Sequence, residues 1–144
     1  MKDVFARFIA LEDAIEDSPI LDDYGKFLSN FFRFLENEIA PIAPHPDQMR
    51  HLVACARAFV AGNFSAEDLR EEWSRYESTC VPNQKDDPHG YHCAIEACWC
   101  ADIDFLSNNI PETLQDSYTS YILNGLFEIT QDLSLCEKLY QYLS

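Results

Sequence analysis

Residues 24–39 read YGKFLSNFFRFLENEI, and this stretch has the clearest helical pattern in the chain. Its apolar side chains recur every three or four residues, which places them on one face of an α-helix. They are Tyr24, Phe27, Leu28, Phe31, Leu35 and Ile39. We expect this helix to begin at Ser18 and Pro19, as N-cap and first helical residue, and to end near Ile39 with its aromatic face in the core.

The rest of the chain repeats the helical pattern between short breakers, and no segment shows the alternation of a β-strand. Gly62 suits the left-handed position after a helix end, and Ser134 with Glu137 has the spacing of a capping box. Further helices are expected over residues 3–17, 46–61, 66–78, 88–108, 111–131 and 134–143, with a loop over 79–88. The sequence therefore predicts an all-α fold, a single-domain bundle of about six to seven helices spanning residues 1–144.

Acidity dominates the composition. The 144 residues include 25 Asp and Glu but only 10 Lys and Arg, which gives a formal net charge of −15. The excess is concentrated after residue 85, where ten acids face a single base, Lys138. Such a field disfavours nucleic acid and membrane surfaces as partners and speeds encounter with basic proteins. The same charge also keeps a small protein soluble, so it indicates a class of partner without specifying one.

The chain has neither the apolar segment of a signal peptide nor a run long enough to span a membrane. Without an export signal, its cysteines are expected to be reduced thiols in a cytoplasmic protein. They are Cys55, Cys80, Cys93, Cys98, Cys100 and Cys136. Oligomeric state is not indicated by any of these features.

Residues 89–100 hold the densest set of reactive side chains. His89, Cys93, Glu96 and Cys100 share one helical stripe, which raises the possibility of a metal site or a Cys–His nucleophile. Seven residues of helix separate Cys93 from Cys100 by about 10 Å, too far for one zinc ion to bind both thiolates. His89 with Cys93 could form half of a site. Acids nearby disfavour a reactive thiolate, and small thiols at helix contacts are the alternative interpretation.

Asp102 falls in the middle of an apolar face of the helix expected over 88–108. A buried carboxylate must be paired, hydrogen-bonded or neutralised, so one alternative gives Asp102 a partner from another helix. The other alternative is that this face is partly exposed and that Asp102 contacts a ligand. No GxSxG, Walker A, GxGxxG or HExxH motif occurs. We therefore expect no enzymatic activity, no cofactor and no resident metal.

Residues 59–69, Phe-Val-Ala-Gly-Asn-Phe-Ser-Ala-Glu-Asp-Leu, followed by Trp73, resemble a segment of bacterial colicin-type and polymorphic-toxin immunity proteins. In those families a helix often ends in Gly, and Ser-Ala-Glu begins the next helix. The resemblance covers about a dozen of the 144 residues. It implies a small acidic cytoplasmic protein that neutralises a cognate toxin, such as a basic nuclease, by tight binding.

The hypothesis favoured by charge and resemblance is an immunity or antitoxin-like protein that occludes a basic toxin. A small metal- or thiol-dependent sensor or enzyme centred on residues 89–100, or a helical adaptor, remains as an alternative. The expected binding surface lies in the acidic C-terminal portion, with tyrosines as anchors. Its residues are Asp86, Asp87, Glu96, Asp102, Asp104, Glu112, Asp116, Tyr118 and Tyr121.

Overall fold

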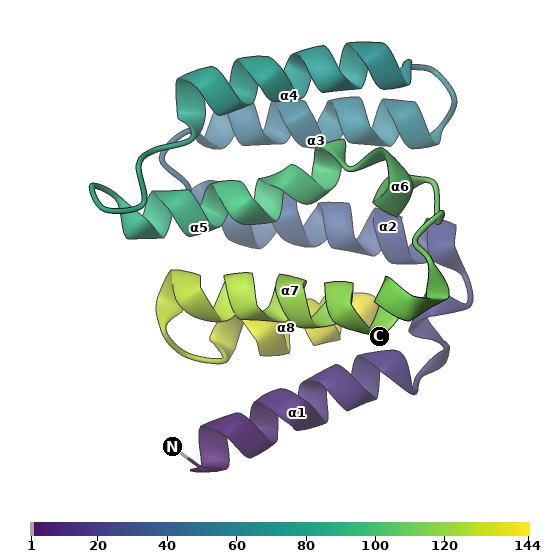
Figure 1. The fold of residues 1–144 in the computed structure, drawn as a ribbon, viewed down its shortest axis with the longest axis vertical. Helices are drawn as coiled ribbons and strands as arrows, with labels where there is room; N and C mark the ends of the chain where they lie inside the picture. The colour runs from purple at the N-terminus through teal and green to yellow at the C-terminus, as the bar shows by residue number, and fades with distance from the viewer. Residues whose placement is uncertain (1) are drawn as a thin grey trace.

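The computed structural model describes the backbone of residues 2–144 and the side chains of residues 3–111 and 117–144 (Figure 1). Within this part of the chain there are eight α-helices and no strand, so the all-α prediction is confirmed. The helices are α1 (Lys2–Glu16), α2 (Tyr24–Phe34), α3 (Pro46–Val60), α4 (Ala66–Cys80), α5 (Pro88–Ala97), α6 (Ile103–Leu106), α7 (Glu112–Thr130) and α8 (Ser134–Leu143).

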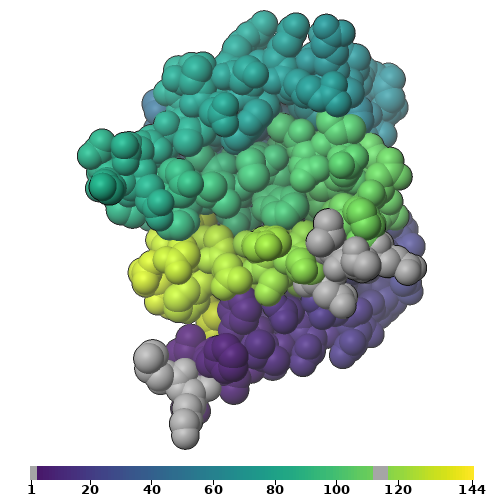
Figure 2. Space-filling view, viewed as in Figure 1, coloured from purple at the N-terminus to yellow at the C-terminus, as the bar shows by residue number. Residues whose placement is uncertain are grey.

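The helices stack in layers. α3 and α4 lie side by side at one end of the molecule, and α1 closes the other end against α7 and α8 (Figure 1). Between these ends α5 packs on α7, and α2 packs on α8 behind them. Figure 2 shows the same order on the surface, with the loop of residues 81–87 projecting from one edge. Among the described residues, no helix has the length and apolar character needed to cross a bilayer.

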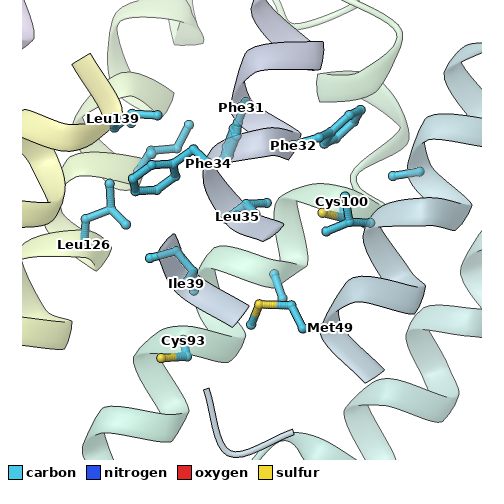
Figure 3. Packing of buried hydrophobic residues seen from close by; sticks show 14 of the residues in the cluster. Phe31, Phe32, Phe34, Leu35, Ile39, Met49, Cys93, Cys100, Leu126 and Leu139 are labelled. Atoms are coloured by element: carbon cyan, nitrogen blue, oxygen red, sulfur yellow. The ribbon is translucent and has the colours of Figure 1, made fainter. Parts of the chain in front are cut away.

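The core is centred on α2 and its π-helical continuation, Leu35–Ile39. Phe34, the last residue of α2, and Leu35, the first residue of the π-helix, are both fully buried. In Figure 3 Phe34 points toward Leu139 of α8, whereas Leu35 points to the opposite side, toward Cys100. The aromatic stripe that predicts this helix is therefore buried from both sides, because α2 lies between the α3–α4 pair and the α7–α8 pair.

The start of the second helix differs from the prediction. Ser18 does accept a hydrogen bond from the backbone N of Ile20, at 3.3 Å, but it caps only a short 3-10 turn, Pro19–Leu21. α2 begins five residues later, where Oδ1 of Asp23 accepts from the backbone N of Lys26 at 3.1 Å. Ser18 is therefore an N-cap as predicted, but of the short turn, and Asp23 is the N-cap of α2.

The junction between α3 and α4 has the predicted geometry. Gly62 adopts φ +83°, and the backbone N of Asn63 donates to the carbonyl of Ala58 at 2.8 Å, which closes the end of α3 as a Schellman motif. Ser65 then accepts from the backbone N of Asp68 at 3.0 Å and starts α4. The capping box expected at Ser134 is wrong, because Ser134 lies inside α8 and Oδ1 of Asp132 accepts from its backbone N instead.

Candidate functional site

The helix expected over residues 88–108 is interrupted after Ala97, and the candidate site lies at this interruption. α5 ends at Ala97, a 3-10 turn covers Cys98–Ala101, and α6 begins at Ile103. Between them Asp102 is extended, and its Oδ1 accepts from the backbone N of Phe105 at 3.1 Å. A short Asp side chain that bonds the backbone competes with a continuous helix in this way. The alternative in which Asp102 is buried and paired with a side chain of another helix is therefore wrong, since Asp102 is the exposed N-cap of α6.

A shallow groove of about 230 Å³ lies between this turn and α7. We call it the acidic groove, and its lining is Trp99, Asp102, Asp104, Ile110, Pro111, Ser117, Tyr118 and Tyr121. Four of the nine residues expected to bind a partner thus meet at one place. Asp102 and Asp104 lie at the N-cap and in the first turn of α6, and Tyr118 and Tyr121 lie in α7.

Aromatic rings form the walls of the acidic groove. The ring centroid of Tyr118 lies 6.3 Å from that of Trp99 and 5.5 Å from that of Phe105. Tyr118 is only 7% exposed, and burial raises the pKa of its hydroxyl. The expectation that Tyr118 is an anchor projecting into a partner is wrong for this conformation, because its side chain is packed into the wall. Tyr121, three positions further along α7, is 66% exposed and projects from the same groove.

The carboxylates of the acidic groove carry uncompensated charge. Asp102 and Asp104 are both exposed, and in the described part of the chain neither forms an ion pair with Lys or Arg. Other acids do find cations, as Glu36 does with Arg57 at 2.6 Å. An exposed aromatic ring beside two unpaired carboxylates is suited to a cationic side chain, which both charge and the π-face attract.

The other predicted residues lie elsewhere. Asp86 is exposed and Asp87 is half-buried at the opposite end of α5, where Oδ1 of Asp87 accepts from the backbone N of Gly90 at 2.9 Å. The ten residues of α5 rise by about 15 Å, and the turn Cys98–Ala101 follows before Asp102, so Asp86 and Asp87 lie well apart from the acidic groove. Glu112 and Asp116 belong to the first turns of α7, and their side chains lie outside the described residues.

Glu96 cannot belong to a binding surface in this fold. Its side chain is 0% exposed between α5 and α7, and neither carboxylate oxygen has a hydrogen-bond partner among the described residues. Burial raises the pKa of Glu96 well above its usual range. Burial favours the protonated form of this carboxyl group. The assignment of Glu96 to partner binding is wrong, because its side chain is not accessible to a partner.

Gly125 of α7 provides the space that Glu96 occupies. A Cβ atom at Gly125 would lie 2.1 Å from Oε1 of Glu96. We expect Gly125→Ala to lower the free energy of unfolding by about 1–3 kcal/mol through overpacking. In a Glu96→Ala background the same change should instead raise it by up to about 1 kcal/mol, because alanine favours the helix. Urea unfolding of the four proteins tests this reversal of sign.

The control for this cycle is Gly25→Ala in α2. There the nearest atom to an added Cβ is Oδ1 of Asp23, at an ordinary contact distance of 3.8 Å. The change should be neutral or stabilising in either background. Equal destabilisation by Gly125→Ala with and without Glu96 would contradict the contact between these two residues.

The alternative of a metal site or a nucleophile within residues 89–100 finds no support in the geometry. Both ring nitrogens of His89 lie 3.1 Å from backbone carbonyls, Nδ1 from that of Ile129 and Nε2 from that of Ile42. The imidazole therefore joins α5 to two other segments instead of facing Cys93. Burial is the main cause that raises the pKa of the Cys93 and Cys98 thiols to about 12. Neither thiol has the electropositive setting of a nucleophile.

Another group of potential metal ligands lies on the α3–α4 face, which the sequence analysis did not single out. His51, Cys55 and Glu72 place one ligand atom each within 4.8 Å of one another. The His-x-x-x-Cys spacing on a helix was a visible signal, because it puts His51 and Cys55 on one face. The position of Glu72 depends on how α4 packs on α3, which no local pattern shows.

No known family, curated protein or solved structure matches this chain. The resemblance of residues 59–69 to immunity proteins therefore stays a prediction, carried by the helix junction alone.

Proposed function

We propose that this protein is an immunity-type inhibitor that binds a basic toxin protein through the acidic groove and occludes the toxin's functional surface. The observation that carries the proposal is that Asp102 and Asp104, two exposed carboxylates without an ion pair among the described residues, line one groove with the exposed ring of Tyr121. A Lys or Arg side chain of the toxin would lie between them. The partner is a protein, and no cofactor or catalytic step is involved.

The distribution of charge supports this partner class. Ten acids and one base occupy residues 86–144, the segment that supplies every residue of the acidic groove. Glu96 is buried, whereas the exposed Asp86 at the far end of α5 extends the field along one edge. Such a field steers a basic protein toward the groove and raises the association rate at low salt. It also repels nucleic acid, so inhibition would act on the toxin and not on its substrate.

The first test removes the groove's contacts without unfolding α6. Asp102→Asn keeps an oxygen that can cap the helix, so the double variant Asp102→Asn/Asp104→Asn removes charge alone. Its affinity for the basic protein encoded beside this gene should fall, with a weaker dependence on salt. Tyr121→Ala should weaken binding about tenfold or more, as expected for an exposed aromatic anchor. Calorimetry at low and moderate salt measures both.

The matched control is Glu71→Gln/Glu77→Gln, which removes two exposed charges from α4. It alters net charge equally and should leave affinity within about twofold. Equal loss in the control would assign binding to net charge alone and contradict the groove. Absence of a basic toxin-like reading frame beside the gene, or of salt-sensitive binding to its product, would overturn the proposed function.

Co-expression separates an inhibitor from a helical adaptor. An immunity-type protein should restore growth to cells that express the neighbouring toxin, and Tyr121→Ala should restore less. Binding without any relief of toxicity would favour the adaptor alternative.

A further inference from the structure

His51, Cys55 and Glu72 converge on one point at the contact between α3 and α4. Nε2 of His51 lies 2.8 Å from Oε2 of Glu72 and 3.6 Å from Sγ of Cys55. His51 and Cys55 are one turn apart on α3, and Glu72 faces them from α4. The three atoms are a nitrogen, a sulfur and an oxygen, which are the atom types that bind zinc in proteins.

Hydrogen bonding accounts for only part of this arrangement. The carboxylate and the thiol both approach the same ring nitrogen of His51. If Nε2 carries a proton, it donates to Glu72, and the Cys55 sulfur is left as a weak acceptor. If Nε2 carries no proton, the thiol can donate to it, and the Glu72 carboxylate faces a lone pair. A single cation between the three atoms would satisfy all of them at once.

The distances are close to those of a zinc site. Zinc bonds of about 2.0–2.3 Å in a tetrahedral arrangement hold neighbouring ligand atoms about 3.3–3.7 Å apart. The sulfur–nitrogen distance of 3.6 Å already lies in this range, and the nitrogen–oxygen distance of 2.8 Å must open by about half an ångström. His51 is exposed, so its ring can make that movement without disturbing the core.

The surroundings favour a site with one open position. Nη1 of Arg75 lies 2.7 Å from Oε1 of Glu72 and holds the carboxylate so that Oε2 stays directed at His51. Outer partners of this kind orient metal ligands. A groove of about 270 Å³ runs alongside and is lined in part by His51, Glu72, Arg75 and Thr79. It leaves room for water in the fourth position, while Cys55, at 7% exposed, is protected from bulk solvent.

We propose that His51, Cys55 and Glu72 form a zinc-binding site, with Nε2, Sγ and Oε2 as ligands and water as the fourth. Binding displaces the proton of the Cys55 thiol to solvent, because only the thiolate coordinates zinc. Thiolate and carboxylate together balance the two charges of the ion. The site is on the α3–α4 face and uses no residue of the acidic groove. A test of zinc binding is therefore independent of a test of the proposed function.

Titration of the chelator-treated full-length protein with zinc and with cobalt tests the site. We expect one ion per chain, one proton released per ion, and a thiolate-to-cobalt charge-transfer band. Zinc at about a hundredfold excess over its dissociation constant should raise the melting temperature by roughly 9 °C. His51→Gln alters an exposed side chain and should weaken zinc binding about a hundredfold, and Cys55→Ala should abolish the cobalt band.

The controls separate this site from general binding to thiols. His92→Gln and Cys98→Ala remove the same side-chain types from α5 and the turn after it, and should leave stoichiometry and affinity unchanged. Circular dichroism establishes that each variant is folded. Zinc binding that is unaffected by His51→Gln, a cobalt band that survives Cys55→Ala, or a loss in the controls equal to that in the site variants would overturn the proposal.

Discussion

Replacing Phe105 with alanine is expected to lower the free energy of unfolding by about 3–5 kcal/mol, more than any other substitution considered. The ring is fully buried, and its centroid lies 5.0–6.3 Å from those of five other rings. These belong to Tyr24, Phe27, Phe31, Trp99 and Tyr118. Rigid rings fill a vacated space poorly, so most of the cavity would remain. Thermal unfolding should begin about 10 °C lower.

The same residue joins the core to the acidic groove. The backbone N of Phe105 donates to Asp102, and its carbonyl accepts the hydroxyl of Tyr24. α6 has only four residues, so its position depends on the burial of Phe105 and Leu106. We therefore expect Phe105→Ala to weaken partner binding in addition to stability, because the carboxylates lose their fixed position.

Phe105→Leu is the control for this substitution. Leucine keeps most of the buried volume, and its cost should stay below about 1.5 kcal/mol, with binding nearly unchanged. Denaturant unfolding of the three proteins, with affinity measured well below their melting temperatures, distinguishes the two effects. A loss below about 1 kcal/mol for Phe105→Ala would mean that α6 is not anchored as described.

The long helices could be predicted because their apolar period alone decides which face is buried. α2 illustrates this, since Phe27, Leu28 and Phe31 recur at helical spacing and all are buried. The junction at Gly62 could also be predicted, because only a residue that tolerates positive φ closes a helix in this way. Both features depend on interactions within a few residues of the chain.

Features set by competition or by tertiary packing could not be predicted in this way. A continuous helix over residues 88–108 puts Asp102 on a buried face. In the structure the helix is interrupted, and the side chain of Asp102 caps a new helix, α6. A signal was present, since an Asp three residues before a large apolar residue is a common helix start. For Glu96 no local signal exists, because its burial results from the absence of a side chain at Gly125, 29 positions along the chain.

The candidate site likewise combines a feature that the sequence predicts with features that depend on tertiary packing. The excess of acids after residue 85 singles out a segment, but charge does not show which of its acids face solvent. Asp104 of α6 and Tyr121 of α7 line one groove because Trp99 and Phe105 pack against Tyr118 of α7. Tyr118 is next to Tyr121 in space, yet one side chain is 7% exposed and the other 66%. On a helix, a change of three positions can move a side chain from the core to the surface.

Glu96→Gln is expected to be more stable than the wild type at neutral pH, with a gap that grows as pH rises. The pKa of Glu96 is raised in the folded state by burial, above its ordinary value of 4.5. The folded protein thus retains a proton that the unfolded chain releases above about that pH. The wild type is therefore favoured at acid pH and loses up to about 1.4 kcal/mol per pH unit above it. Glutamine has no proton to lose.

Urea unfolding of both proteins between pH 5 and pH 8 measures the difference. We expect the stability of Glu96→Gln relative to the wild type to increase from pH 5 toward pH 8, because the wild type alone loses stability as the pH rises above the unfolded pKa of Glu96. Glu77→Gln makes the same chemical change at an exposed position of α4 and should show no such divergence. A constant difference across this range would mean that the carboxylate is charged in the folded protein. That result would require a cation or a water channel between α5 and α7, because a charge left bare in that contact would cost several kcal/mol.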